Sequence, residues 1–133
     1  MKTREQVLEA IKAKAIWDRA NCGVLDGRDF GRLINFMPVE DWHTLGFKLK
    51  DGETHEAKPW TPESLMEQVT RDIQFCHEKA TYQRGISSAL MHDVVRMWCW
   101  VFEHDDLASD LTEHSDYGLS YVEAAAERFG VTV

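Results

Sequence analysis

The chain has 133 residues, of which 44% are hydrophobic and 11% aromatic, so it is long enough for one core and too apolar for a disordered acidic segment. Its formal net charge of -8 lies entirely in the C-terminal half: residues 1–60 hold ten basic and ten acidic side chains, and residues 61–133 hold five and thirteen. Because such a surface repels nucleic acid and anionic membranes, we expect no direct nucleic-acid binding and no membrane binding.

The N-terminal segment lacks the apolar stretch of a secretory signal, and no run approaches the roughly 18 apolar residues that a membrane span needs. The three cysteines, Cys22, Cys76 and Cys99, are widely spaced and odd in number, which is typical neither of a disulfide framework nor of a zinc site. We therefore expect a cytoplasmic protein with reduced, buried thiols. Its length favours a single domain over residues 1–133.

The first predicted helix covers Arg4–Asn21. Thr3 and Gln6 have the spacing of a capping box at its start, and Gly23 offers a stop after its end. Its inward positions recur at helical spacing and are Val7, Leu8, Ile11 and Ala15. An amphipathic helix of this kind buries one face against the rest of a domain.

Two short helices and a loop are predicted next. The first helix carries Phe30, Leu33 and Ile34. The second runs over Val39–Leu45, with Pro38 as its first helical residue. Residues 47–50 then alternate with period two before the turn pair Asp51-Gly52, so at most one short β-hairpin is expected near residues 47–56. An exposed loop is the preferred interpretation, because the residues after the turn are polar.

Thr61-Pro62-Glu63 is the clearest helix start in the chain and predicts a helix that ends near Gly85. A second helix, about Ser88–His104, follows so closely that the two should form a central helical hairpin. The inner stripe of the first helix is predicted to be Leu65, Met66, Val69, Ile73, Cys76 and Ala80.

The second hairpin helix is apolar nearly all round its last two turns. Its inward stripe is Leu90, Met91, Val94, Trp98, Val101 and Phe102, and Val95, Met97, Cys99 and Trp100 extend the apolar surface. Such a helix is usually buried on all sides. We favour the central helix of the domain, with a homodimer interface through Val94 to Phe102 as the alternative.

A last helix is predicted over Tyr121–Phe129. Ser120 and Glu123 have the spacing of a second capping box, and Gly130 offers a stop. The expected fold class is therefore all-α: a single compact helical domain of five or six helices.

The densest acidic stretch, Glu103 to Asp116, contains six carboxylates and no Lys or Arg. With His104 and His114 it supplies ligand types that divalent metals take, although the spacing matches no known metal motif. A metal-dependent enzyme using residues 103–116 is therefore an alternative rather than the expectation. Motifs for phosphate cradles and hydrolase nucleophiles are also absent from the sequence, so no catalytic residue and no cofactor is assigned.

The five tryptophans are numerous for this length, and tryptophan is favoured at interface hot spots. Trp60 borders a polar loop and Trp100 interrupts a polar face, so these two are expected to be the most exposed. The candidate partner-binding residues are Glu103, Asp105, Asp106, Asp110, Glu113, Asp116, Trp100 and Trp60.

The C-terminal third contains the segments Arg84-Gly85-Ile86-Ser87-Ser88-Ala89-Leu90-Met91 with Val94, Trp98 to Glu103, and Tyr117-Gly118-Leu119. In these segments the chain resembles small accessory proteins encoded by tailed phages and prophages. The resemblance implies a bacterial cytoplasmic setting and an accessory role, and it carries no activity or site residue with it.

These observations lead to the hypothesis of a non-enzymatic interaction protein, a phage accessory factor or a mimic of nucleic-acid charge. Its acidic C-terminal surface would bind a basic protein partner through electrostatic steering followed by burial of aromatic groups. An oligomeric structural protein built on Val94 to Phe102 is the third alternative.

Overall fold

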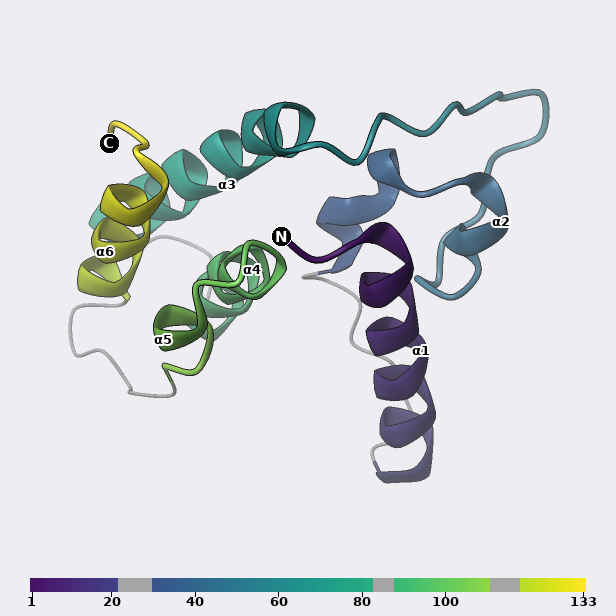
Figure 1. The fold of residues 1–133 in the computed structure, drawn as a ribbon, viewed down its shortest axis with the longest axis horizontal. Coiled ribbons are helices and arrows are strands. Elements are labelled where there is room, and N and C mark those ends of the chain that lie inside the picture. The colour runs from purple at the N-terminus through teal and green to yellow at the C-terminus, as the bar shows by residue number, and fades with distance from the viewer. Residues whose placement is uncertain (22–29, 83–87, 111–117) are drawn as a thin grey trace. The chain divides into compact units, whose positions relative to one another are not determined.

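The computed structural model describes residues 1–21, 30–82, 88–110 and 118–133 (Figure 1). Every regular element among these residues is helical, which confirms the all-α prediction. The seven helical segments are α1 (Arg4–Asn21), the 3-10 helix η1 (Phe30–Phe36), α2 (Val39–Trp42), α3 (Pro62–Tyr82), α4 (Ser88–Val101), α5 (Asp105–Ala108) and α6 (Leu119–Phe129).

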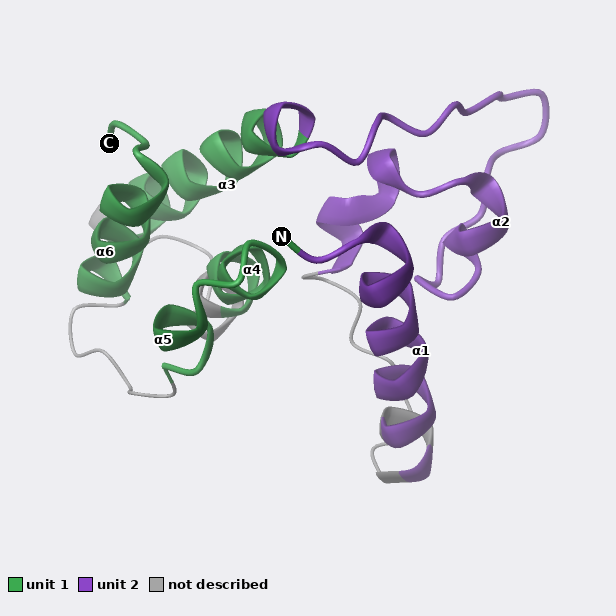
Figure 2. Ribbon diagram, in the orientation of Figure 1, with its two compact units in different colours: residues 1, 65–133 green, residues 2–64 purple. Residues whose placement is uncertain are grey.

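The chain divides into two compact units (Figure 2). Unit 1 comprises Met1 and Leu65–Val133, and therefore holds most of α3 together with α4, α5 and α6. Unit 2 comprises Lys2–Ser64 and holds α1, η1 and α2. The expectation of a single domain over residues 1–133 stays a prediction.

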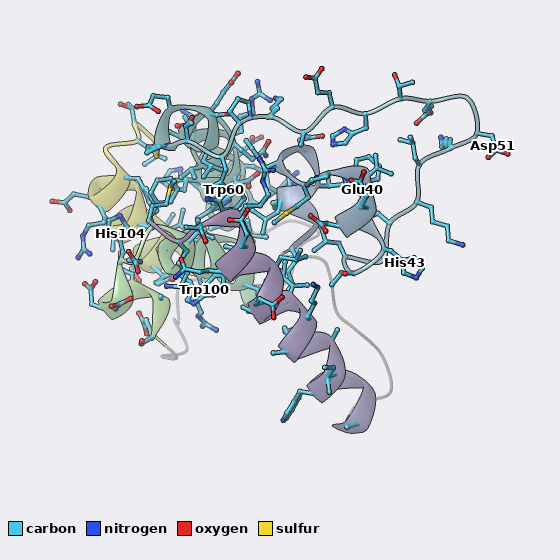
Figure 3. The ribbon with its side chains drawn as sticks, turned by 45° about the vertical axis from the view of Figure 1, so that its right-hand side comes forward. Glu40, His43, Asp51, Trp60, Trp100 and His104 are labelled. Carbon is cyan, nitrogen blue, oxygen red and sulfur yellow. The ribbon has the colours of Figure 1, made fainter. Side chains whose placement is uncertain are left out.

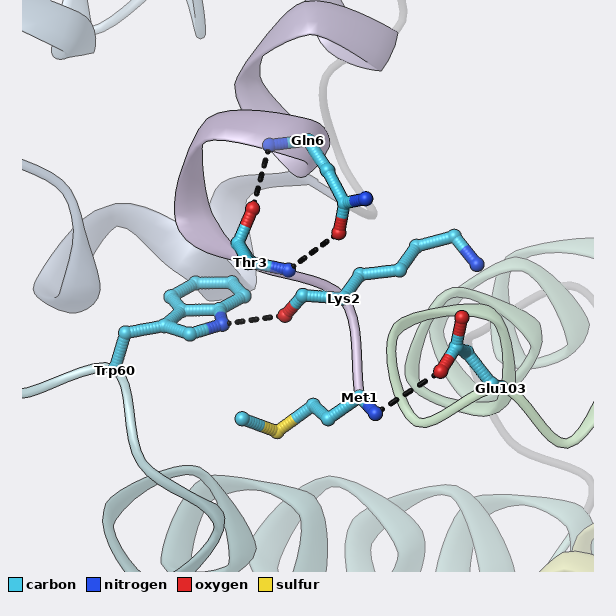
Figure 4. A network of polar contacts seen from close by, with 6 residues as sticks. All are labelled: Met1, Lys2, Thr3, Gln6, Trp60 and Glu103. Carbon is cyan, nitrogen blue, oxygen red and sulfur yellow. Dashed lines mark hydrogen bonds and ion pairs between the residues drawn. The ribbon is translucent and has the colours of Figure 1, made fainter.

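Helix α1 begins where the sequence predicts it. The Thr3 hydroxyl accepts a hydrogen bond from the Gln6 backbone N–H at 3.1 Å, and the Gln6 side-chain oxygen accepts one from the Thr3 N–H at 2.9 Å (Figure 4). Two N–H groups at the helix start are thus satisfied reciprocally, which confirms the capping box. The stripe is confirmed too: Val7, Ile11 and Ala15 are buried, and Leu8 is half-buried.

The core of unit 2 is completed by η1 and α2. The Trp42 indole N–H lies 3.0 Å from the Ile34 carbonyl oxygen and 2.9 Å from that of Met37, so it ties α2 to the end of η1. Pro38 precedes α2 with an extended ψ of 154°, outside the helix rather than as its first residue. The buried apolar residues here are Phe30, Leu33, Phe36, Met37, Trp42 and Leu45.

The segment between α2 and α3 contains a turn and no strand among its residues, in agreement with the loop interpretation (Figure 1). Gly52 has a φ of 84°, and the Glu53 N–H donates to the Lys50 carbonyl oxygen at 3.0 Å. A positive φ at the third turn position suits glycine, because a Cβ is disfavoured there. Asp51 occupies the turn (Figure 3).

Helix α3 starts at the predicted Thr61-Pro62 signal. The Ser64 backbone N–H donates to the Thr61 hydroxyl at 3.2 Å, as an N-cap requires. Five of the six predicted inward side chains are buried and Met66 is half-buried; the buried five are Leu65, Val69, Ile73, Cys76 and Ala80.

A buried carboxylate joins α3 to α4. Asp72 is 3% exposed; its Oδ2 accepts the Trp98 indole N–H at 2.7 Å, and its Oδ1 accepts the Gln68 amide N–H at 2.9 Å. Burying a carboxylate is unfavourable unless hydrogen bonds replace those to water, so this contact requires α3 and α4 to align. The turn of the predicted hairpin, residues 83–87, lies outside the described residues.

Most of the apolar surface on α4 is buried within the chain itself. The buried side chains are Val94, Val95, Met97, Trp98, Cys99 and Val101. Their burial agrees with the central-helix interpretation. Of the apolar side chains from Val94 to Phe102, Trp100 and Phe102 are half-buried and the others are buried. The predicted side chains Leu90 and Met91 are not among those described.

Helix α4 ends at Val101, three residues before the predicted end. Glu103 has a left-handed φ of 61°; its N–H donates to the Trp100 carbonyl oxygen at 3.2 Å, and the His104 N–H donates to that of Cys99 at 2.8 Å. This pair of bonds is a Schellman motif, which usually places glycine where Glu103 lies. The single-turn helix α5 then follows as a separate element.

The predicted cap of α6 is wrong, whereas the predicted end is confirmed. Gly118, with a φ of 86°, is the N-cap without a side-chain bond, so Ser120 already lies in the first turn. Gly130 closes the helix with a φ of 69°, and the Val131 N–H donates to the Ala126 carbonyl oxygen at 2.8 Å.

Replacing Thr3 with Ala should lower the free energy of unfolding by about 1 kcal/mol, because the Gln6 N–H loses its acceptor. Thr3→Ser is the matched control, since it keeps the hydroxyl. Urea unfolding followed by circular dichroism checks both variants. Equal stability of the two variants would contradict the capping role.

Replacing Trp98 with Phe should cost about 3 kcal/mol of unfolding free energy, because the buried Asp72 carboxylate loses a donor and the core loses volume. Trp60→Phe is the control: it removes an indole bond to a backbone oxygen at a half-buried position and should cost about 1 kcal/mol. Urea unfolding measures both. A Trp98→Phe loss no larger than that of the control would exclude the carboxylate contact as a major constraint.

Candidate functional site

The predicted acidic stretch begins at the turn between α4 and α5. Glu103, Asp105 and Asp106 are exposed, and Asp110, just after α5, is half-buried. Glu113 and Asp116 lie outside the described residues. The structure therefore brings the first three carboxylates together on one short turn and the first residues of α5.

Glu103 pairs with the chain's own amino group. The Met1 nitrogen lies 3.0 Å from Glu103 Oε2, and the Glu103 side chain keeps 54% of its surface exposed (Figure 4). A left-handed backbone at a residue other than glycine costs on the order of 1 kcal/mol. A glycine at position 103 would therefore adopt this backbone conformation at a lower energetic cost than glutamate does.

Asp106 pairs with Arg128 on α6. Two guanidinium nitrogens donate to its two carboxylate oxygens at 2.8 Å and 2.7 Å, the parallel arrangement that makes arginine–carboxylate pairs strong. These hydrogen bonds from Arg128 lower the pKa of Asp106 from its ordinary value of 3.8 to about 2. The charge of Asp106 is thus largely balanced inside unit 1.

The ring of His104 packs against an aromatic side chain of α6. Its centroid is 4.8 Å from that of Phe129, which also meets the Phe102 ring at 5.3 Å in an edge-to-face arrangement. Burial lowers the pKa of His104 below 6.5, and the Arg128 charge lowers it further. The ring, labelled in Figure 3, is therefore mostly neutral at pH 7 and packs with Phe129 rather than carrying a charge.

The two tryptophans proposed as partner contacts are both half-buried. The Trp60 indole N–H donates to the Lys2 carbonyl oxygen at 2.8 Å, and its ring meets that of Phe36 at 6.3 Å, both within unit 2 (Figure 4). The most exposed tryptophan is Trp17, at 60%. The expectation was wrong because Trp60 finds a backbone acceptor, which neighbouring polar residues could not reveal.

Sequence reasoning missed two exposed acids on α6. Glu123 and Glu127 are four residues apart and so share one face of the helix. Glu123 Oε1 lies 3.3 Å from His77 Nε2 on α3. The four-residue spacing is visible in the sequence, but both glutamates lie beyond the dense acidic stretch, Glu103 to Asp116.

Unit 2 carries a separate surface pocket of about 360 Å³ between α1 and the end of α2. Its lining residues are Lys12, Ala15, Ile16, His43 and Thr44. Of these lining residues, Ile16 is 70% exposed. Two of the lining side chains, Lys12 and His43, are titratable, and the other three supply contact area without an ionisable group.

The cysteines show no reactive environment among the described residues. Cys76 is 1% exposed while the next side chain, His77, is half-buried and turned toward Glu123, so the two do not share a face. Burial raises the pKa of the Cys99 thiol to about 11. Cys22 lies outside the described residues.

Within residues 1–21, 30–82, 88–110 and 118–133, the His, Cys, Asp and Glu side chains that the structure describes form no group of three that could surround a metal ion. Over the same ranges, no helix combines the length and apolar character needed to cross a membrane.

Comparison of the chain with protein-family models, with curated proteins and with solved structures found no match.

The carboxyl of Asp106 should titrate with a midpoint near pH 2 in a carbon-detected NMR titration. Because its pKa is lowered in the folded chain, the stabilisation from the Arg128 pair is complete above the unfolded value of 3.8 and is lost as the pH falls through about 2. Arg128→Gln should move the midpoint back toward 3.8. Arg71→Gln, which breaks a pair with Glu67, should leave it in place. An Asp106 midpoint that ignores Arg128 would contradict the ion pair.

Proposed function

We propose that the chain is a non-enzymatic interaction protein that binds a basic protein partner through the acidic surface of unit 1. Residues 65–133 hold twelve acidic and five basic side chains. A charge excess of this size cannot be balanced within the unit, because there are too few cations. The question is then whether the cations that do exist are available to outside groups.

Every described basic side chain of unit 1 already has an internal partner. Arg71 pairs with Glu67 at 3.0 Å and Arg128 with Asp106 at 2.7 Å. Arg96 lies 3.8 Å from Asp93 and donates to the Asp110 carbonyl oxygen at 2.8 Å. The Lys79 ammonium lies 5.5 Å from the centre of the Phe75 ring. Arg84 is outside the described residues.

The proposal depends on those acidic side chains of unit 1 that have no Lys or Arg partner among the described residues. Glu78, Asp105 and Glu127 are exposed, and no Lys or Arg within the described ranges forms an ion pair with any of them. Their carboxylates remain in water, where they attract cations. A basic protein surface would supply the missing charges.

The mechanism is electrostatic steering followed by close contact. Interactions between exposed charges extend about 10 Å at 0.1 M salt, which accelerates encounter with a cationic surface. The neutral His104 ring with Phe129 and Phe102 offers apolar area beside the acids once the partner arrives. The resemblance to phage and prophage proteins supports an accessory role in a bacterial cytoplasm, including mimicry of nucleic-acid charge.

The proposal is tested by removing the unpaired acids. A variant with Glu78→Gln, Asp105→Asn and Glu127→Gln should lose about tenfold or more in affinity for basic proteins captured at low salt, measured by titration with the purified partner. The matched control, Glu40→Gln, Asp51→Asn and Glu53→Gln, removes three exposed charges from unit 2 instead. It should bind as the unmodified chain does.

Salt gives a second readout of the same proposal. Raising the salt concentration tenfold should weaken the complex strongly for the unmodified chain and less for the unit 1 variant. An affinity for the partner that does not fall with added salt would refute binding through unit 1. Equal losses of affinity in the two triple variants would refute it as well.

A further inference from the structure

The segment from Glu53 to Pro59 in unit 2 runs as an extended trace between α2 and α3 (Figure 1), and Lys58 uses its backbone groups on one edge of it. The Lys58 N–H donates to the Asn35 carbonyl oxygen at 2.8 Å, and the Lys58 carbonyl oxygen accepts from Arg4 Nη2 at 3.4 Å. In an extended chain the N–H and C=O of one residue point to the same side, and the side alternates along the chain. The N–H and C=O of Glu56 therefore point to the same side as those of Lys58, the side of Asn35. The N–H and C=O of His55 and Ala57 point to the opposite side.

The opposite edge is free of backbone hydrogen bonds. Across the part of the chain that the structure describes, no backbone–backbone bond involves His55 or Ala57. A row of unpaired N–H and C=O groups on an extended segment is a template for another strand.

Side-chain contacts hold this segment in place. The His55 ring lies 4.4 Å from that of Trp42, and its Nε2 lies 3.0 Å from the Met37 carbonyl oxygen. At the C-terminal end, the Trp60 indole is bonded to the Lys2 carbonyl oxygen. The edge is therefore ordered before any partner binds, which lowers the entropy cost of pairing.

We propose that a second copy of this chain pairs with this edge, antiparallel and centred on Ala57. In that register each Ala57 N–H donates to the other copy's Ala57 carbonyl, and each His55 N–H donates to the other copy's Pro59 carbonyl. The bonding ends there, because Pro59 has no N–H to return. The result is a closed, two-fold symmetric contact in which both copies use the same surface.

Charge complementarity selects this occupant and this register. Glu56 and Lys58 are both exposed. With Ala57 at the centre, Glu56 of each copy faces Lys58 of the other in the non-hydrogen-bonded pair, where opposite side chains approach most closely. Centring the pairing on Glu56 instead would set the two glutamates against each other, which is unfavourable. The segment is thus complementary to itself.

The backbone arm of the test uses proline. Sedimentation equilibrium of the full chain, from micromolar to millimolar concentration, should show a monomer–dimer equilibrium. Ala57→Pro removes the two central N–H donors and should weaken dimerisation at least tenfold. Thr54→Pro is the matched control, because its N–H lies on the other edge and outside the paired residues; it should dimerise as the unmodified chain does.

The charge arm tests the register. Glu56→Lys alone and Lys58→Glu alone should each weaken the dimer about tenfold, since both symmetric pairs become repulsive. The double variant Glu56→Lys, Lys58→Glu should restore the original affinity. Only a register with residue 56 opposite residue 58 predicts that restoration.

Amide hydrogen exchange supplies a readout that does not depend on variants. Protection of the His55 and Ala57 amides should rise with protein concentration, whereas that of the Glu56 amide should not. A monomer at every concentration, a dimer indifferent to Ala57→Pro, or single-variant losses that the double variant fails to restore would each overturn the proposal. The proposal would also be overturned if this edge paired with an unrelated peptide and not with a second copy of the chain.

Discussion

The organisation of unit 1 depends on a single buried carboxylate. Asp72 lies in the apolar stripe of α3 and is excluded from water, so its oxygens need donors from the protein. Trp98 on α4 and Gln68 on α3 provide them. Since desolvation offsets much of what these bonds contribute, their main effect is to permit one alignment of the two helices. Leu65, Val69, Ile73, Val94 and Val101 can then fill the core around that alignment.

Local signals explain how much of the fold could be predicted. The capping box at Thr3 and the Thr61-Pro62 start act within a few residues, so the sequence alone locates α1 and the start of α3. Asp72 was not foreseen because its partner Trp98 is 26 residues away and an acid in a stripe gives no sign of burial. The early stop of α4 was missed because Glu103 occupies a position where glycine is the usual signal.

The candidate site shows the same division between what is local and what is distant. The number of acids in the 103–116 stretch follows directly from the sequence. The sequence cannot reveal that Arg128 balances the charge of Asp106 from 22 residues away or that the Met1 amino group reaches Glu103. Charge pairing depends on tertiary structure. Glu78 and Glu127, which have no ion pair with a described Lys or Arg, therefore emerge as candidates only after each described cation of unit 1 has been matched with its neighbour.

The extended segment before α3 also affects how the chain meets proteases. Endoproteases bind their substrates as extended strands, and exposed loops are where nicking concentrates. Glu53 to Pro59 already has that shape, although the proline after Lys58 blocks trypsin-like cleavage at that bond. Enzymes that cut after glutamate find Glu53 and Glu56 accessible. Digestion by the two enzyme classes should therefore differ in this segment, and a copy that covers the free edge would shield Glu56, whereas Glu53 lies outside the paired residues.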